Sequence, residues 1–132
     1  MTSNFRAKYV EEAQEILNSL EVSILTLEND SSNMEMVEVV FRAMHTLKGG
    51  GAMFGFNKIK DATHELETIF DRIRNGEMTV CKSLLDITLE SIDYFDKLLK
   101  TEETLEDNGY QDKLIERITS ITCRSEEHTS EL

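Results

Sequence analysis

Hydrophobic side chains recur every three or four residues along most of this 132-residue chain. An α-helix turns once in about 3.6 residues, so this spacing places apolar side chains along one face of a helix. Polar segments such as residues 29–33 interrupt the pattern. The pattern predicts five amphipathic helices, at about residues 5–28, 34–54, 57–75, 79–100 and 109–122.

The apolar stripe of each predicted helix marks its expected core side. In the first helix the stripe is Phe5, Tyr9, Ala13, Ile16, Leu17, Leu20, Ile24 and Leu27, and in the fourth it is Cys81, Leu84, Leu85, Thr88, Ile92, Phe95 and Leu99. Gly55 is expected to end the second helix in the left-handed conformation that glycine adopts without strain. Asn57 is expected to cap the third helix, because asparagine accepts from free N–H groups at a helix start.

Composition and connection lengths both favour a helical bundle. The chain has no proline, and 39% of its residues are apolar, which is enough for one domain with a core. Short connections between long amphipathic helices favour antiparallel neighbours. We therefore predict one all-α domain at residues 1–123, an antiparallel up-and-down four-helix bundle with an accessory fifth helix.

Charge and cysteine usage limit the function classes. A formal net charge of −12 opposes binding to nucleic acid or to an anionic membrane. No apolar run approaches the ~20 residues that span a bilayer, and the start does not resemble a signal peptide. Cys81 and Cys123 lack metal-ligand spacing, so we expect buried or incidental thiols in a reducing cytosol. A cytoplasmic protein is the resulting expectation.

The last residues of the chain differ from the rest. Residues 124–132 have no apolar period and resemble the read-through translation of a common sequencing-library adapter. We therefore expect a non-native tail that should be left out of arguments on fold and function. A disordered native tail is the alternative.

The second and third predicted helices carry the candidate chemistry. In the second helix, His45 lies roughly 120° from the middle of the apolar face, so its side chain should be exposed. Lys48 follows one turn later on the same side. In the third helix, His64 points largely outward and Glu67 lies at the flank of the stripe. Two helices packed through their stripes could bring His45 and Glu67 into hydrogen-bond reach.

This arrangement suits phosphoryl transfer. An exposed imidazole is largely neutral at pH 7, and its free nitrogen can accept a phosphoryl group without a metal ion. If Glu67 accepts from Nδ1–H of His45, Nε2 is left as the nucleophile. Lys48 would offset the added negative charge, and His64 would add a further donor.

These residues resemble a known family. His45-Thr-Leu-Lys48-Gly49-Gly50 through Phe54-Gly55-Phe56, followed by Thr63-His64-Glu-Leu-Glu67, is similar to the histidine phosphotransfer (HPt) domain of CheA-type chemotaxis kinases, over about residues 5–122. The resemblance implies an HPt-like bundle in which His45 is the phosphorylated histidine. It also implies that Glu67 is the carboxylate that binds the ring, with Lys48 and His64 as supporting basic residues.

The resemblance further implies the partners. A separate kinase domain would bind ATP and Mg, phosphorylate His45, and belong to the same longer histidine kinase. His45 would pass the group to an aspartate of a response-regulator receiver domain. This segment itself has no nucleotide-binding loop and is expected to need no cofactor and no metal. Gly49, Gly50 and Gly51 are expected to clear a docking surface for the receiver domain.

Other function classes remain open from the sequence. One is a metal-binding bundle using His45, His64 and Glu67, although di-iron bundles need several Glu-x-x-His motifs and His64-Glu-Leu-Glu67 is a single reversed copy. Another is a non-catalytic adaptor that binds a partner through its acidic face. A third is an HPt domain from a kinase outside chemotaxis.

Overall fold

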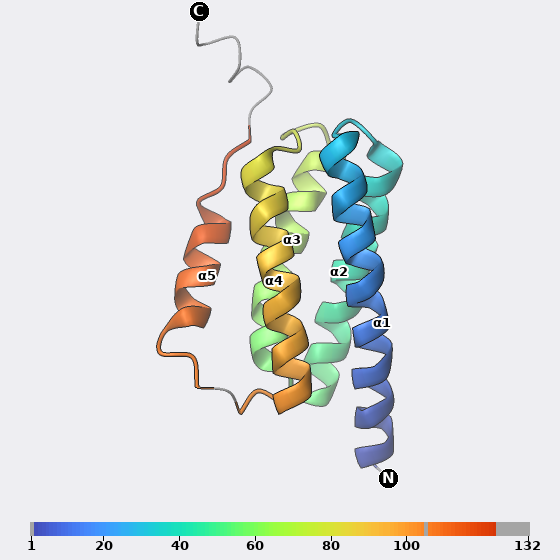
Figure 1. The fold of residues 1–132 in the computed structure, drawn as a ribbon, viewed down its shortest axis with the longest axis vertical. Coiled ribbons are helices and arrows are strands. Elements are labelled where there is room, and N and C mark those ends of the chain that lie inside the picture. The colour runs from blue at the N-terminus through green and yellow to red at the C-terminus, as the bar shows by residue number, and fades with distance from the viewer. Residues whose placement is uncertain (1, 105, 124–132) are drawn as a thin grey trace, which may run out of the picture.

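Five α-helices make up the secondary structure of the described residues. The computed structural model describes residues 2–104 and 106–123. The helices are α1 (Thr2–Asn29), α2 (Met34–Phe54), α3 (Asn57–Arg74), α4 (Lys82–Thr101) and α5 (Tyr110–Thr119). The first four run alternately up and down beside one another, and α5 lies outside them (Figure 1). The predicted all-α fold class is confirmed, while residues 124–132, expected to be a non-native tail, lie outside the described residues.

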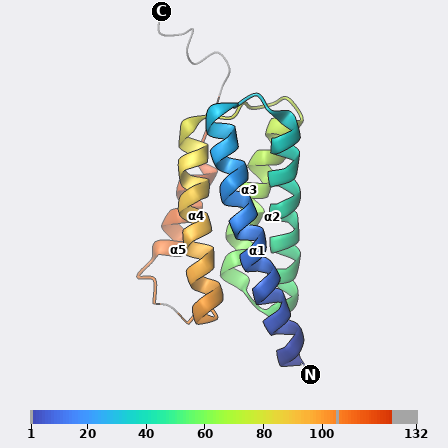
Figure 2. The ribbon, with the colours of Figure 1, turned by 45° about the vertical axis from the view of Figure 1, so that its right-hand side comes forward.

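The core lies between α1, α2, α3 and α4. α2 packs most extensively on α3, α1 contacts both α2 and α4, and α5 packs against α3 and α4. Figure 2 shows α1 crossing in front of the α2–α3 pair, with α5 behind α4. The largest fully buried side chains include Phe56, Phe70, Phe95, Leu20, Ile24 and Leu27. Most of the predicted stripes therefore form this core.

Phe5 was wrongly assigned to the core. Its side chain is 64% exposed. The N-terminal end of α1 extends below the rest of the bundle in Figure 1, so the first turns of this helix have little to pack against. The buried stripe of α1 begins one turn later, at Tyr9.

The ends of α2 follow from local sequence. The side chain of Asn33 accepts a hydrogen bond from the backbone N–H of Met36 at 3.0 Å, which caps the helix start. Gly55 adopts the predicted left-handed conformation with φ of 83°, and its N–H donates to the carbonyl of Gly51. The predicted bounds of this helix are confirmed at both ends.

The start of α3 differs from the prediction. Asn57 is the first helical residue and does not cap, and Phe56 before it makes no side-chain capping bond. The carboxylate of Glu103 instead accepts from the backbone N–H groups of Lys58 at 3.1 Å and Ile59 at 3.0 Å. A carboxylate at this end is favourable because the free N–H groups carry partial positive charge. The α4–α5 connection therefore caps the helix that carries Glu67.

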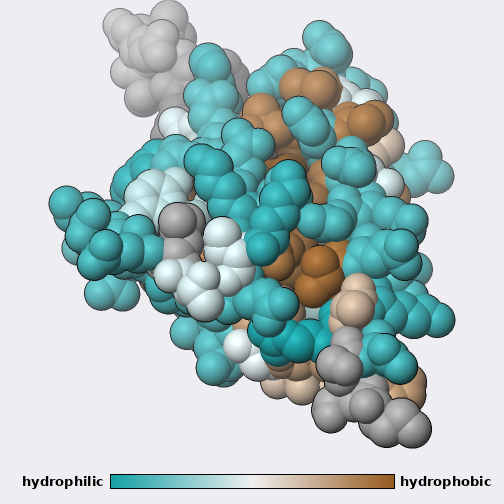
Figure 3. Space-filling model, turned by 60° about the horizontal axis from the view of Figure 1, so that its bottom comes forward, coloured by the Kyte–Doolittle hydropathy of each residue, from teal (hydrophilic) through white to brown (hydrophobic). Residues whose placement is uncertain are grey.

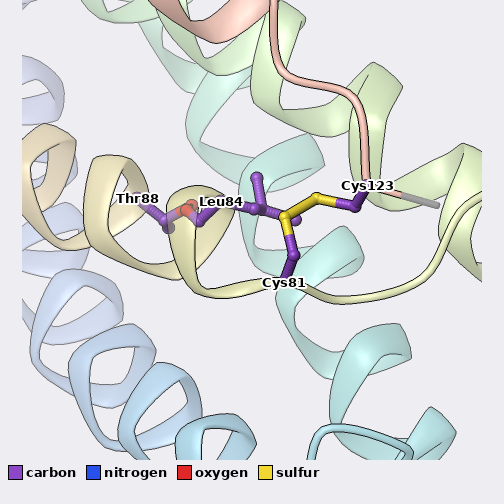
Figure 4. Close-up of a disulfide and its surroundings, with 4 residues drawn as sticks. All are labelled: Cys81, Leu84, Thr88 and Cys123. Atoms are coloured by element: carbon purple, nitrogen blue, oxygen red, sulfur yellow. A yellow bond between two sulfur atoms is a disulfide. The ribbon is translucent and has the colours of Figure 1, made fainter. Parts of the chain in front are cut away.

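The predicted α4 began too early, and the predicted α5 extended too far at both ends. The prediction of separate thiols at Cys81 and Cys123 was also wrong. α4 begins at Lys82, preceded by an extended Cys81, and Thr79 N–H donates to the carbonyl of Cys123 at 3.2 Å. Cys81 and Cys123 form a disulfide rather than separate thiols (Figure 4). The pairing was not predictable from spacing, because 42 residues separate the two cysteines and only the packing of α5 beside α4 brings them together.

The surface is mostly polar. Hydrophilic residues cover most of the lower end of the bundle, and hydrophobic residues reach that surface in a limited area (Figure 3). Within residues 2–104 and 106–123, no helix has an apolar stretch long enough to cross a membrane.

Candidate functional site

The α2 helix presents His45 to solvent. Met44 and Leu47 on either side of it in sequence are fully buried and fix the rotation of the helix. The His45 side chain itself is 67% exposed. The structure therefore places His45 on the flank of the bundle, as the stripe of α2 predicted.

Glu67 on α3 contacts the His45 ring. Oε2 of Glu67 lies 2.6 Å from Nδ1 of His45, and the Glu67 side chain is only 10% exposed. An ionised carboxylate can only accept, so Nδ1 must carry the proton that it donates. The other nitrogen, Nε2, is then unprotonated in the neutral ring, and it has no hydrogen-bond partner among the described residues.

Lys48 binds the second oxygen of the same carboxylate. Its Nζ lies 2.5 Å from Oε1 of Glu67, one turn along α2 from His45. Glu67 is thereby satisfied on both oxygens, which a nearly buried carboxylate requires. In this structure the charge of Lys48 is paired with Glu67 and is not directed at Nε2.

The protonation of Glu67 follows from these contacts. Burial raises the pKa of its carboxyl, but the hydrogen bonds and charges of Lys48 and His45 outweigh that effect and hold the pKa below its ordinary value. Glu67 therefore stays ionised near neutral pH and remains an acceptor for the Nδ1 proton.

His64 is exposed on α3 but makes no hydrogen bond to His45 or Glu67 in the described structure. It lines a shallow hollow of about 520 Å³ together with Lys48, Gly49, Ala52 and residues of α3 and α5. The structure thus places His64 near Lys48 but does not bring it into contact with the ring of His45.

The three glycines divide into one exposed and two packed positions. A Cβ at Gly49 would meet nothing within 4 Å, whereas one at Gly50 would lie 2.2 Å from the ring of Tyr9. Tyr9 packs there and donates to the carbonyl of Leu47 at 3.2 Å. A Cβ at Gly51 would lie 3.0 Å from the carbonyl oxygen of Phe56. Gly50 and Gly51 therefore allow close helix packing, and only Gly49 of the three has open space beside it. The docking role expected of these glycines stays a prediction.

One neighbour of His45 had no role in the sequence interpretation. The ring of Phe41, one turn earlier on α2, is stacked on the imidazole with centroids 6.5 Å apart and planes 20° apart. The guanidinium of Arg74, the last residue of α3, lies over the Phe41 ring at 3.8 Å from its centroid. The spacing of Phe41 and His45 was the available signal, because residues four apart are neighbours on a helix.

The described residues contain no group of three His, Cys, Asp or Glu side chains placed to hold a metal ion. His45 and Glu67 contact each other, but His64 does not join them. The set His45, His64 and Glu67 therefore forms a hydrogen-bonded pair beside a separate histidine rather than a ligand cluster. An exposed imidazole with one nitrogen held by a carboxylate and the other free is an arrangement suited to a nucleophile.

Comparisons with known proteins agree with this geometry. A family model described as the Hpt domain matches residues 4–108. The chemotaxis protein CheA of Borreliella burgdorferi is 38% identical over 91 residues, which are 69% of this chain and 10% of that protein. The chain thus spans a small part of the curated relatives it matches.

Solved structures show the same fold. The CheA phosphotransferase domain from Thermotoga maritima has a TM-score of 0.71 at 32% identity, covering 75% of this chain and 94% of that one. The phosphorylated P1 domain of CheA3 in complex with CheY6 from R. sphaeroides has a TM-score of 0.79, covering 91% of this chain and 95% of that one. Its identity is 22%, so this second likeness concerns the fold alone.

Proposed function

The chain belongs to the histidine phosphotransfer (Hpt) domain family, in the group of CheA phosphotransferase domains, and we propose that it carries a phosphoryl group on His45 in a two-component phosphorelay. The observation that carries the proposal is the exposed imidazole whose Nδ1 is held by Glu67 at 2.6 Å. That contact leaves Nε2 free to attack phosphorus.

The transfer needs little from the protein besides orientation and charge. The electron pair of Nε2 forms a bond to the γ-phosphorus of ATP, and the bond from that phosphorus to the departing ADP oxygen breaks. The ring becomes positively charged as the bond forms, because Nδ1 keeps its proton. Glu67, ionised and adjacent, stabilises that positive charge, much as a buried carboxylate stabilises the imidazolium in hydrolase triads.

The second transfer reverses the role of His45. A carboxylate oxygen of a receiver-domain aspartate attacks phosphorus, the bond from phosphorus to Nε2 breaks, and the ring returns to its neutral form. Lys48 lies one turn from His45 and holds Glu67 at 2.5 Å. We assign it the role of keeping Glu67 ionised and of offsetting phosphate charge when the group is bound. His64 is assigned a supporting role at the rim of the same hollow.

The kinase partner lies outside this segment. We propose that a separate catalytic domain of the same CheA-like kinase supplies ATP and Mg, so the chain is phosphoacceptor and phosphodonor rather than a complete enzyme. We assign residues 1–123 to the phosphotransfer domain. A cytoplasmic location and a role in chemotaxis are part of the proposal, supported by the CheA relatives.

The response-regulator partner is proposed to dock around His45. The related P1 domain of CheA3 is in complex with CheY6. In this chain the exposed Gly49 and Ala52 follow His45 on α2, and no side chain at Gly49 would obstruct an approaching domain. We place receiver docking at Gly49 and not at Gly50 or Gly51.

The test is labelling by a CheA kinase core with radioactive ATP. The unmodified chain should gain an acid-labile, alkali-stable phosphate, and His45→Gln should lose it entirely while keeping its helical circular dichroism, because the side chain is exposed. His64→Gln substitutes another exposed histidine on the neighbouring helix and should still be labelled. Label retained in His45→Gln would move the acceptor elsewhere, and no label on the unmodified chain would favour the adaptor function.

A further inference from the structure

The ring of His45 has two restraints on its orientation, and only one is explained by Glu67. The bond from Nδ1 to Oε2 of Glu67 selects which edge of the imidazole faces α3. A single hydrogen bond still lets the ring pivot about it, and the χ2 torsion of histidine is broad. A second contact is needed to fix the plane of the ring and hence the direction of Nε2.

Phe41 supplies that second contact. Its half-buried ring is nearly parallel to the imidazole, with 20° between planes and 6.5 Å between centroids. This separation lies within the range over which aromatic rings attract each other. The flat face of Phe41 therefore limits rotation of His45 in the direction that the Glu67 bond leaves free.

Arg74 in turn holds the Phe41 ring in place. The guanidinium lies 3.8 Å from the centroid of the Phe41 ring, a distance suited to a cation–π contact. Nε of Arg74 donates to Asp71 at 2.8 Å on α3, and Nη1 donates to Glu38 at 3.2 Å on α2. Arg74 therefore joins the two helices and keeps its plane over the Phe41 ring.

We propose that Phe41 is a positioning residue for phosphoryl transfer at His45, fixing the plane of the imidazole so that Nε2 faces the incoming phosphorus, and that Arg74 holds Phe41 in place. The inference rests on the proposed function, because it concerns the orientation of the same acceptor. It adds a restraint on the face of the imidazole to the one that Glu67 places on its Nδ1 edge.

The first test observes the ring without any kinase. The fractions of the Nδ1–H and Nε2–H tautomers of His45 are measured by long-range ¹H–¹⁵N correlation in the full chain. Phe41→Leu should raise the ratio of Nε2–H to Nδ1–H about three- to tenfold, the factor that an aromatic contact of ordinary strength corresponds to. A ring that turns out of its plane loses alignment with Oε2 of Glu67, and with it the bond that favours the Nδ1–H form. Phe41→Tyr keeps the ring and should restore the original ratio. Arg74→Gln should give a smaller change in the same direction.

The matched control is Phe5→Leu. It makes the same substitution at an exposed phenylalanine of α1, which makes no aromatic contact with His45 in the described part of the chain. It should leave the tautomer ratio unchanged. An unchanged ratio in a folded Phe41→Leu chain, or an equal change in Phe5→Leu, overturns the proposal.

The second test is a double-mutant cycle on the labelling rate. Phe41→Leu should lower kcat about three- to tenfold and leave KM for the chain unchanged, because orientation rather than docking is lost. In a Glu67→Gln background the same substitution should cost much less, since the two restraints act on one ring. Independent, multiplying effects would overturn the proposal. If no variant is labelled at all, the proposed function fails, while the tautomer ratio still decides whether Phe41 orients the ring.

Discussion

Two carboxylates in this molecule have similar partners and different consequences. Glu67, between α2 and α3, accepts from Lys48 and from the His45 ring. Glu90, between α4 and α5, accepts from Arg117 at 2.8 and 2.9 Å and from the Tyr110 hydroxyl at 2.6 Å. Each glutamate thus joins one cation and one ring donor across a pair of helices.

The difference lies in what the ring can do once it is bound. The phenol of Tyr110 has one polar atom, which Glu90 occupies, and burial together with that bond raises its pKa above the ordinary value. The imidazole of His45 has two nitrogens, and Glu67 occupies one of them. A hydrogen bond to a glutamate therefore only links α4 and α5 at Tyr110, whereas at His45 it links α2 and α3 and also leaves a reactive nitrogen free.

The largest effect in this comparison should come from opening the disulfide near the α4–α5 pair. Cys123→Ser removes the bond to Cys81, which closes a loop of 42 residues. The free energy of unfolding should fall by about 2–4 kcal/mol, since the bond restricts the unfolded chain. Urea unfolding with and without dithiothreitol measures this, and only the unmodified chain should respond to the reductant.

The same variant separates the two regions. Labelling of His45 should persist in Cys123→Ser, because the disulfide lies near the start of α4 and not at the α2–α3 pair (Figure 4). Loss of labelling in a folded, reduced chain would mean that the two regions are coupled and that the comparison fails.

Replacing each glutamate with glutamine should change different quantities, the labelling rate for Glu67 and the free energy of unfolding for Glu90. Glu67→Gln should slow labelling of His45 by about 10- to 100-fold, the range found when a carboxylate that orients a metal-binding histidine is lost. The fold should remain, since the amide oxygen still accepts from the ring. Glu90→Gln should leave the labelling rate unchanged and reduce the free energy of unfolding by no more than about 1 kcal/mol, as for other exposed ion pairs.

Initial labelling rates and urea unfolding of both variants measure these two effects. Equal rates for the two variants would show that Glu67 does not orient His45. A slowed Glu90→Gln chain with intact helices would give the α4–α5 pair a role in transfer that the structure does not indicate.

The smallest expected effect is on acid stability. Hydrogen bonds from Arg117 lower the pKa of Glu90 from 4.5 to about 2, against the opposing effect of burial. Because the folded value is the lower one, this stabilisation is present above pH 4.5 and is lost as pH falls from 4.5 to about 2. The Glu90 side chain is 37% exposed, so solvent screening keeps the effect small.

Urea unfolding between pH 6 and about 2 should show this loss, and Glu90→Gln should have a flatter profile over the same range. The pKa of Glu67 is also lowered, so Glu67→Gln should flatten the acid side as well. A Glu90→Gln profile that matches the unmodified chain would remove Glu90 from the acid-sensitive groups.

The sequence predicted the elements that depend on local patterns. The predicted bounds of α2 and the predicted left-handed conformation of Gly55 were correct. Both depend on residues within or next to the helix, namely its apolar stripe and the glycine at its end. The exposed position of His45 and its approach to Glu67 followed from the stripes of α2 and α3, which pack on each other.

The features that were missed depend on distant residues. Asn57 had the right residue type for a cap, but Glu103 reached the same N–H groups from the far end of α4. Gly50 looked like an open surface position, yet Tyr9 of α1 fills the space beside it. The sequences of α2 and α3 alone could not predict the Glu103 cap or the Tyr9 contact, because each depends on how other parts of the chain pack against these helices.

The cap on α3 also affects how the domain can form. Lys58 and Glu103 are 45 residues apart, so the first turn of the helix that carries Glu67 is completed only after the chain has passed through the whole of α4. Closing such a long loop costs entropy before the contact repays it. A nascent or truncated chain that ends at α4 would therefore have a frayed α3, and the acceptor site would mature only when the following connection is in place.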